Sequence, residues 1–169
     1  METQRLHLIP LTATQLKLWT ENLPALEKEL NCSYQAEPVE GQFLAIVKGQ
    51  AKKASNDEAN CLYHTFWFLV RKTDRIVVGS ACFKGVPDEN GEVEIGYGLG
   101  KHFERNGYMT EAVKAICKWA LEQKGISHVT AETEIDSPAS QNVLKRCGFS
   151  LYRQDDTCWW RLQVKTVAE

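Results

Sequence analysis

One stretch of the sequence gathers residue types that bind anions, and it runs from Lys101 to Thr110. His102 and Arg105 supply hydrogen-bonding or cationic side chains, and Gly107 would let the backbone approach an anion closely. The stretch connects a strand-like segment to an amphipathic helix pattern. Because the first turn of a helix carries unpaired N–H groups and partial positive charge, a strand-to-helix loop of this kind is a natural phosphate site. The sequence therefore predicts a local anion-binding loop.

The hydrophobic periodicity predicts the elements that position this loop. In chain order, we expect a short edge strand 5–10, two helices from Thr12 separated near Pro24, a loop 31–36, a helix 37–54 with Phe43, Ile46 and Val47 buried, strands 65–71, 76–83 and 92–98, a helix 109–124, a strand 128–135, a helix from Ser137 that ends at Gly148, and a hairpin of 149–153 with 157–164. The strand–helix–strand run over 92–135 needs a crossover, so its two strands are predicted to be parallel.

Length and charge restrict the class of protein. The chain has 169 residues, with 20 Lys+Arg against 22 Asp+Glu and a formal net charge of −2. We expect one domain over residues 1–169 and no broad surface for nucleic acid or anionic membranes. No apolar run approaches the roughly 20 residues of a membrane helix, and the N-terminus lacks the pattern of a signal peptide.

The six cysteines carry no metal-binding or catalytic pattern. No two are spaced as Cys-x-x-Cys, no His pair has a zinc-ligand spacing, and no cysteine has a recognisable His partner. We therefore predict no metal site and no cysteine nucleophile. Buried, reduced thiols in a cytoplasmic protein are favoured over disulfides.

The run EIGYGLGKHFERNGYMTEAVKAICKWAL (94–121), followed by SPASQNVLKRCGF (137–149), resembles the Gcn5-related N-acetyltransferase (GNAT) superfamily, and within it the branch of the ribosomal-protein N-terminal acetyltransferases. The motifs EIGY, GY-x-T-E-A and P-A-S-x-x-V-L-x-x-x-G-F follow the family's order and spacing. The resemblance implies an α/β (α+β) fold with a mixed, mostly antiparallel central sheet, a splayed parallel strand pair and flanking helices. It also implies acetyl transfer from acetyl-CoA to a primary amine, either a protein N-terminus or a small-molecule amine, by direct attack in a ternary complex.

The resemblance further implies a binding site for acetyl-CoA. The family's pyrophosphate signature, Gln/Arg-x-x-Gly-x-Gly/Ala, falls on residues 102–107, where only Gly107 matches and Arg105 replaces the first glycine. Backbone N–H groups do not depend on side-chain identity, so the loop can still surround a pyrophosphate. The residues expected to bind the cofactor are Tyr97, Gly98, Leu99, His102, Arg105, Asn106, Gly107, Tyr108, Met109, Thr110, Ser137 and Ser140.

Two catalytic candidates follow from the same resemblance. Glu94 occupies the position of a carboxylate that serves as base or proton relay, although the solvated face of an edge-like strand is the more common role of such a residue. Leu144 stands where many members have a tyrosine acid, which leaves Ser140 as the candidate acid or, alternatively, a small residue against the cofactor. A backbone N–H near Gly98 or Leu99 is the natural hydrogen-bond donor to the oxygen anion of the tetrahedral intermediate that forms when the amine attacks the thioester.

The acceptor amine is expected where the N-terminal helices meet the last hairpin. Candidate substrate-binding residues are Tyr34, Phe43, Glu94 and Trp159, with packing in the core or a dimer interface as the alternative for Trp159. Two functions remain open: an N-acetyltransferase, and a non-catalytic acyl-CoA-binding or regulatory module on the same fold. A monomer and a homodimer both fit. A nucleotide-binding protein is disfavoured, because no Gly-rich turn follows the first strand.

Overall fold

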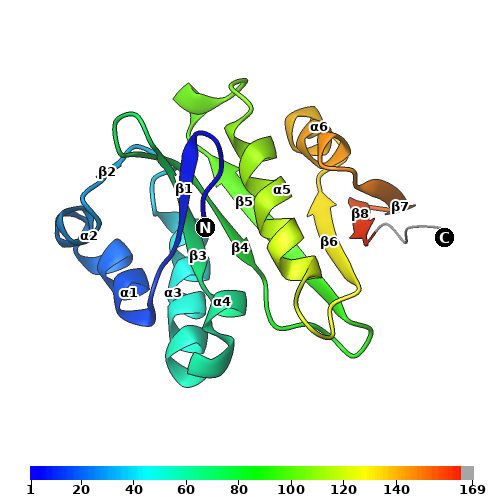
Figure 1. Cartoon of the computed structure of the whole chain (residues 1–169), viewed down its shortest axis with the longest axis horizontal. Helices are drawn as coiled ribbons and strands as arrows, with labels where there is room; N and C mark the ends of the chain where they lie inside the picture. Colours follow the sequence, from blue (N-terminus) through cyan, green and yellow to red (C-terminus); the bar gives the residue numbers. More distant parts are fainter. Residues whose placement is uncertain (165–169) are drawn as a thin grey trace.

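The computed structural model describes residues 1–164 (Figure 1). The last five residues of the expected domain lie outside the described part. The strands are β1 (Leu6–Pro10), β2 (Ser33–Tyr34), β3 (Phe66–Arg71), β4 (Ile76–Phe83), β5 (Glu92–Leu99), β6 (His128–Thr133), β7 (Ser150–Gln154) and β8 (Cys158–Gln163). The helices are α1 (Ala13–Glu21), α2 (Leu23–Leu30), α3 (Gly41–Asn56), α4 (Cys61–His64), α5 (Tyr108–Leu121) and α6 (Pro138–Arg146), with 3₁₀ turns η1 (Glu58–Asn60) and η2 (Lys101–Phe103).

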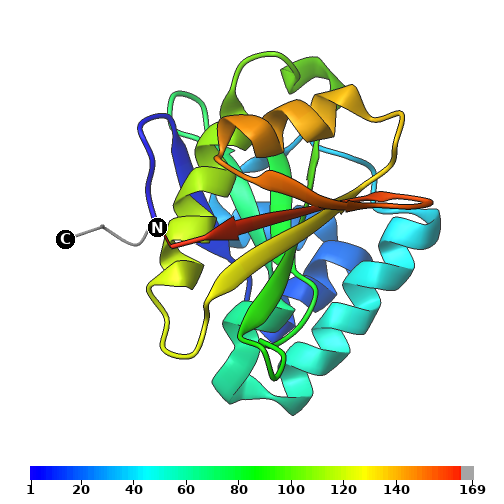
Figure 2. The ribbon, with the colours of Figure 1, turned by 90° about the vertical axis from the view of Figure 1, so that its right-hand side faces the viewer.

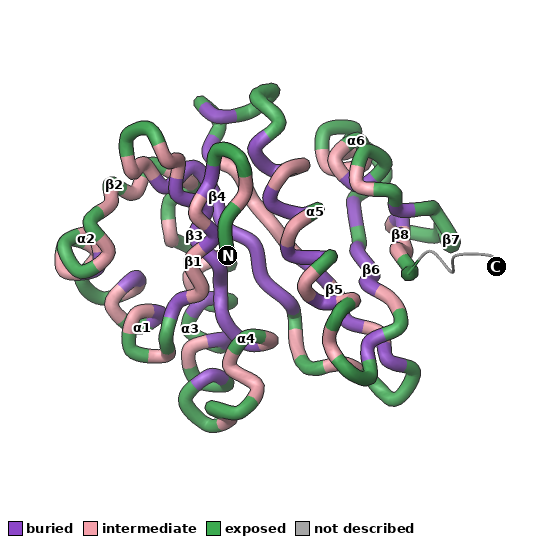
Figure 3. Tube along the Cα trace, in the orientation of Figure 1, coloured by how far each residue is buried: buried purple, intermediate pink, exposed green. Residues whose placement is uncertain are grey.

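All strands join in one sheet of order β1-β3-β4-β5-β6-β8-β7, and β2 pairs with β4 beside this path. Neighbouring strands are antiparallel except for β5–β6 and β2–β4, which are parallel. The α/β fold with a mixed, mostly antiparallel sheet and one parallel β5–β6 pair is therefore confirmed. The outer strand β7 is exposed along its length, whereas β3 and β4 are buried in the centre (Figure 3).

The sheet separates two hydrophobic cores. One core lies under α5 and α6 and includes Ile95, Ile116 and Leu144. The other lies under α1, α2 and α3 and is centred on Trp19, whose ring makes edge contacts with Phe66 and Phe68. Figure 2 shows the sheet between α5 on one side and α3 on the other. The two faces of β5 therefore look into different environments.

Local capping explains the first two helices. Thr12 forms a capping box with Gln15 at the start of α1, and the Asn22 side chain accepts from the N–H of Ala25 at the start of α2. The predicted pair of short helices is confirmed, and Pro24 lies in the first turn of α2, where its missing N–H costs no hydrogen bond.

Two expectations for the region before β3 are wrong. The helix predicted from residue 37 begins only at Gly41, which has a left-handed φ of +56° that α-helical backbone cannot continue through. Residues 37–40 are therefore an extended rim. Ile46 is 47% exposed instead of buried, because it faces a cleft between α3 and the sheet.

Smaller differences concern element ends. The expected loop 31–36 contains β2, which pairs in parallel with Ile76 and Val77 of β4. The helix α5 ends at Leu121 instead of residue 124. In residues 1–164, no helix has the length and apolar composition of a membrane span.

Candidate functional site

The strands β5 and β6 pair over a short distance and then separate. Their parallel register covers only Glu92–Glu94 with His128–Thr130, although β5 stays paired with β4 as far as Leu99. The bonds from the Lys84 N–H to Glu94 and from the Gly100 N–H to Val78 show that even-numbered residues of β5 point their backbone groups at β4. Because these directions alternate along an antiparallel strand, the N–H groups of Tyr97 and Leu99 face the opening.

The loop beyond β5 leads to a helix start that is free of capping side chains. Gly107, with φ +79°, is the N-cap of α5, and within the described residues no side chain caps this end. The side chains of Tyr108 and Met109 are buried in the core, so these residues offer only backbone N–H groups to a ligand. Four successive amides, from Gly107 to Thr110, are therefore available to an anion at the positive end of α5.

Arg105 adopts the conformation of the glycine that it replaces. Its φ is +63°, in the left-handed region that L residues enter at a cost of about 1–2 kcal/mol. Arg105 thus has the left-handed conformation expected of a glycine at this position, with strain at one residue.

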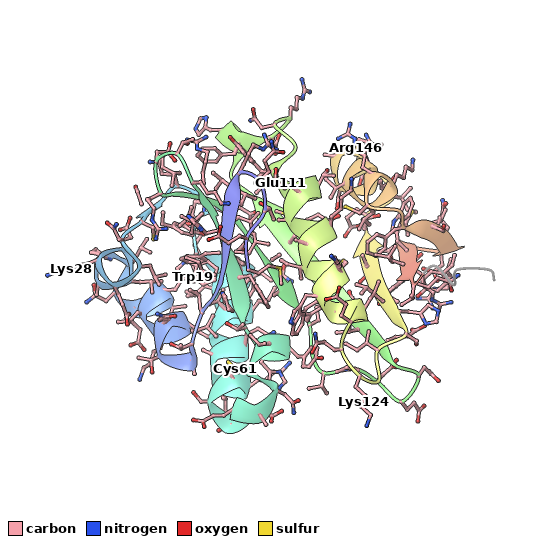
Figure 4. The ribbon with its side chains drawn as sticks, viewed as in Figure 1. Trp19, Lys28, Cys61, Glu111, Lys124 and Arg146 are labelled. Atoms are coloured by element: carbon pink, nitrogen blue, oxygen red, sulfur yellow. The ribbon has the colours of Figure 1, made fainter. Side chains whose placement is uncertain are left out.

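The N-terminal segment supports this loop from outside. The Arg5 guanidinium donates to the backbone oxygen of Asn106 and to the carboxylate of Glu111, both at 2.8 Å, and lies over the Tyr108 ring. Figure 4 labels Glu111 near the start of α5. The Asn106 side chain turns back to the carbonyl oxygen of Phe103, at 3.0 Å, so it stabilises the loop instead of extending from it.

A hydrogen bond crosses from β5 to α6 near the opening. The Tyr97 hydroxyl lies 3.0 Å from Ser140 Oγ and 3.1 Å from the Ser140 backbone oxygen. Burial raises the pKa of Tyr97 to about 12, against a smaller opposing effect of the bond with Ser140. The hydroxyl therefore keeps its proton at neutral pH. Leu144, at the family's tyrosine position, is fully buried in the core under α5 and α6.

A cleft of about 500 Å³ lies on the opposite face of β5, between that strand, β4 and α3. Its lining residues are Glu37, Phe43, Ile46, Gly49, Gln50, Lys53, Phe66, Ser80, Cys82, Lys84, Gly96, Tyr97 and Gly98. The two glycines of β5 face this cleft, because Gly96 and Gly98 alternate with the core residues Ile95 and Tyr97. Their lack of side chains makes the floor of the cleft.

Glu37 is a cleft residue that the sequence did not reveal. Its carboxylate lies against Gly98, so that a Cβ atom at Gly98 would collide with Oε1 of Glu37. The Tyr34 hydroxyl donates to the backbone oxygen of Glu37 at 2.5 Å and so fixes the rim. Partial burial raises the pKa of Glu37 above its usual range. The alternating glycines after Glu94 were the one available signal for an open strand face here.

The carboxylates of β5 are engaged in ion pairs. Glu94 lies 2.5 Å from Lys84 Nζ, and Glu92 lies 2.7 Å from a guanidinium nitrogen of Arg161. Lys84 borders the cleft, so Glu94 is adjacent to it through its partner. Glu94 thus remains a candidate proton relay, in contact with a neighbouring cation.

The other predicted site residues are spread around these features. Phe43 lines the cleft and packs on Trp19. Tyr34 lies behind the rim, and Trp159 on β8 stacks with Arg153 and is not among the residues that line the cleft. His102 is exposed in η2, and Ser137 is the N-cap of α6.

The cysteines form no disulfide, and all six are free thiols. Cys82 lines the cleft, but its burial raises the pKa of the thiol to about 12. It stays protonated at neutral pH and is unsuited to nucleophilic attack. No group of three or more His, Cys, Asp or Glu side chains within residues 1–164 could hold a metal ion.

The geometry agrees with comparisons to known proteins. Residues 5–150 match the family described as acetyltransferase (GNAT) domain, and the chain belongs to this family. An uncharacterized N-acetyltransferase of Bacillus subtilis (strain 168), YjdG, is 41% identical over 85 residues, which are 50% of this chain and 51% of that protein. The chain is thus matched over about half the length of this curated relative.

Two solved structures show the same fold at low sequence identity. Ribosomal-protein-S5-alanine acetyltransferase from Vibrio fischeri has a TM-score of 0.70 at 14% identity, over 100% of this chain and 98% of that one. RimL, a ribosomal L7/L12 alpha-N-protein acetyltransferase in complex with coenzyme A, has a TM-score of 0.65 at 16% identity, with 96% of both chains covered. Both ribosomal-protein acetyltransferases thus share the fold of this chain.

Proposed function

We propose that this chain is an acetyl-CoA-dependent N-acetyltransferase that acts on a primary amine, the acceptor attacking directly in a ternary complex. One observation carries the proposal. The unpaired end of β5 lies between an anion-binding loop on the α5 side and an open cleft on the α3 side. A donor held by the loop and an acceptor in the cleft would meet at Tyr97 and Gly98.

The residues present fit acetyl-CoA. The free amides of Gly107 to Thr110 suit a pyrophosphate, and Arg105 keeps the loop conformation with its cation nearby. The N–H of Leu99, directed at the opening, suits an amide of an extended ligand or the oxygen of a thioester. When bound, acetyl-CoA supplies an activated acetyl group. RimL is a structural neighbour with coenzyme A bound, which supports the same assignment for this chain.

Tyr97 and Ser140 are the proposed proton donors to the departing thiolate. The Tyr97 hydroxyl comes from β5 instead of α6, yet its bond to Ser140 Oγ places it beside the residue that the family resemblance assigns to this region. With Leu144 buried, Tyr97 takes over the task of the absent α6 tyrosine. Glu94, which lies on the cleft side of β5 in an ion pair with Lys84, is the proposed relay for the proton of the amine.

Protonated Cys82 argues for direct attack instead of an acyl-enzyme. The competing function is a non-catalytic acyl-CoA-binding module. Two observations favour it: Leu144 is buried, and the Glu94 carboxylate is already paired with Lys84.

The release of free CoA thiol from acetyl-CoA, measured against a panel of amines that includes peptides with free N-termini, tests the proposal. Turnover with at least one amine is expected. Calorimetric binding of acetyl-CoA without release on any member of the panel would leave the binding module as the function, and no binding at all would contradict both.

A further inference from the structure

The cleft has ends of opposite charge. Glu37 lies at the end beside Gly98, where the strands β5 and β6 have separated. Lys53 lines the other end, ten residues along α3 from Phe43. At about 1.5 Å per residue, this part of α3 is about 15 Å long. The cleft is therefore elongated, with a carboxylate near the site of chemistry and an ammonium group far from it.

The Glu37 carboxylate is positioned but not engaged. Tyr34 holds the backbone of Glu37, and the aromatic group of Trp19 and Phe68 packs around Tyr34. Within residues 1–164, no hydrogen bond or ion pair to the carboxylate itself is found, whereas Glu94, four residues along β5 from Gly98, is paired with Lys84. A fixed carboxylate without a partner, next to the open strand end, is suited to receive an ammonium group.

The end of the cleft at Lys53 favours an anionic group. Lys53 has no carboxylate within 4.0 Å among the described residues, and Lys84 is neutralised by Glu94. The side chains of Lys53, Lys84 and Glu94 together carry one net positive charge at this end. A second ammonium group of a polyamine would therefore be repelled here, whereas a carboxylate would be attracted.

Between the ends, the cleft combines apolar walls with one buried amide. Phe43, Ile46 and Phe66 supply the walls. Gln50 is 6% exposed, and its Nε2 donates to the backbone oxygen of Phe83 at 3.1 Å, which leaves Oε1 as a free acceptor. An extended peptide of four residues spans about 13 Å, close to the length of the cleft.

We propose that the cleft selects a short acceptor segment whose primary ammonium contacts Glu37 and whose anionic group, three to four residues away, contacts Lys53. The acceptor class is then an acidic peptide N-terminus and not a polyamine. This inference rests on the proposed function, because it assigns the cleft to the acceptor.

The test compares three acceptors: a tetrapeptide with Asp at positions three and four, the same peptide with Lys there, and spermidine. The acidic peptide is expected to have a kcat/KM about fivefold above that of the basic one, as for an exposed ion pair. Lys53→Glu should reverse this order, while Lys52→Gln, an exposed α3 lysine outside the cleft, should preserve it. A preference that Lys53→Glu leaves unchanged, or spermidine as the best acceptor, would overturn the proposal.

Glu37→Gln tests the other end. It should lower kcat/KM for every amine by about 10- to 100-fold, the worth of a charge-assisted hydrogen bond, with the Kd of acetyl-CoA within about twofold of wild type. Equal kcat/KM in the variant and wild type would remove Glu37 from the acceptor site. If no amine is acetylated, the proposed function is contradicted, and the cleft assignment is then tested by calorimetry of the same peptides in the presence of CoA. The acidic peptide should still bind more tightly than the basic one. Equal binding of the two peptides would refute the cleft assignment.

Discussion

The two regions proposed to bind ligands are built in different ways. The loop region, residues 97–110, is continuous in sequence and offers mainly backbone groups, since Tyr108 and Met109 are buried and Asn106 folds back on the loop. The cleft combines side chains from three distant segments: the rim at Glu37, the helix α3, and the strands β4 and β5.

This difference determines how each region responds to substitution. A backbone site depends on conformation, and Arg105 shows that the conformation can persist when the glycine is lost. A side-chain site depends on identity, so each change in Glu37 or Lys53 alters which acceptor fits. The loop suits a ligand common to a whole family, and the cleft suits one particular to this chain.

Gly107→Trp should have the largest effect. A side chain at φ +79° strains the loop, and its Cβ would lie 3.3 Å from the Arg5 guanidinium, so the amide site should close. We expect a loss of at least about 100-fold in acetyl-CoA affinity by calorimetry, since several charge-assisted bonds disappear. Gly125→Trp, at φ +87° with open space around it, is the matched control and should bind normally. Intact binding by the Gly107 variant would move the cofactor elsewhere.

Gly98→Ala should affect the cleft and spare the loop. The new methyl group displaces the Glu37 carboxylate, while the backbone groups of Gly98 already bond β4. We expect a fall of about tenfold in kcat/KM for the amine with little change in the Kd of acetyl-CoA. Gly96→Ala is the control, because its Cβ meets only ordinary contacts at 3.5 and 3.6 Å. A parallel loss of acetyl-CoA binding would mean that the two regions are not separable.

Tyr97→Phe should affect the step that both regions share. Removal of the hydroxyl deletes the proton donor beside Ser140, so kcat should fall about tenfold at unchanged KM for acetyl-CoA. Because burial raises the pKa of Tyr97 to about 12, the wild-type hydroxyl stays protonated as the pH rises from about 7 to about 10. Tyrosine ionisation should therefore produce no decline of kcat in this range. A wild-type kcat in the variant would exclude Tyr97 as the acid.

Arg105→Gly should have the smallest effect of these variants, and the effect should be on the stability of the protein. Relief of the left-handed strain, less the entropy that glycine loses on folding, should raise the free energy of unfolding by about 0.5–1 kcal/mol. Urea denaturation measures it. Arg75→Gly is the contrast: Arg75 has φ +61°, but its side chain donates to the backbone oxygens of Leu30 and Asn31, so this variant should lose stability. A destabilised Arg105 variant would show that its side chain supports the loop.

The loop can be predicted from the sequence because its signals are local. The motif residues from Glu94 to Thr110 are consecutive, and the glycine and helix-start pattern defines a conformation whatever surrounds it. The same reasoning placed the parallel β5–β6 pair, because a strand–helix–strand run needs a crossover.

The sequence predicts the residues of the cleft less completely than those of the loop. Glu37 falls inside the helix that the pattern predicts, because nothing in the pattern reveals that Gly41 adopts a left-handed conformation. Trp159 stacks with Arg153 on β8 and Tyr34 donates to the backbone oxygen of Glu37, and neither lines the cleft, so their contact with the acceptor stays a prediction. Periodicity assigns a residue to a face of its own element, but not to a neighbour across the sheet.

The sequence by itself determined the order of elements, the family resemblance and the amide loop, because these depend on short-range conformational preferences. Only the tertiary structure decided that Glu37 covers Gly98, that Tyr97 reaches Ser140, and that Glu94 is paired with Lys84. These contacts join residues up to 61 positions apart in the chain, as from Glu37 to Gly98, and they exist only because sheet registry and helix packing bring those positions together.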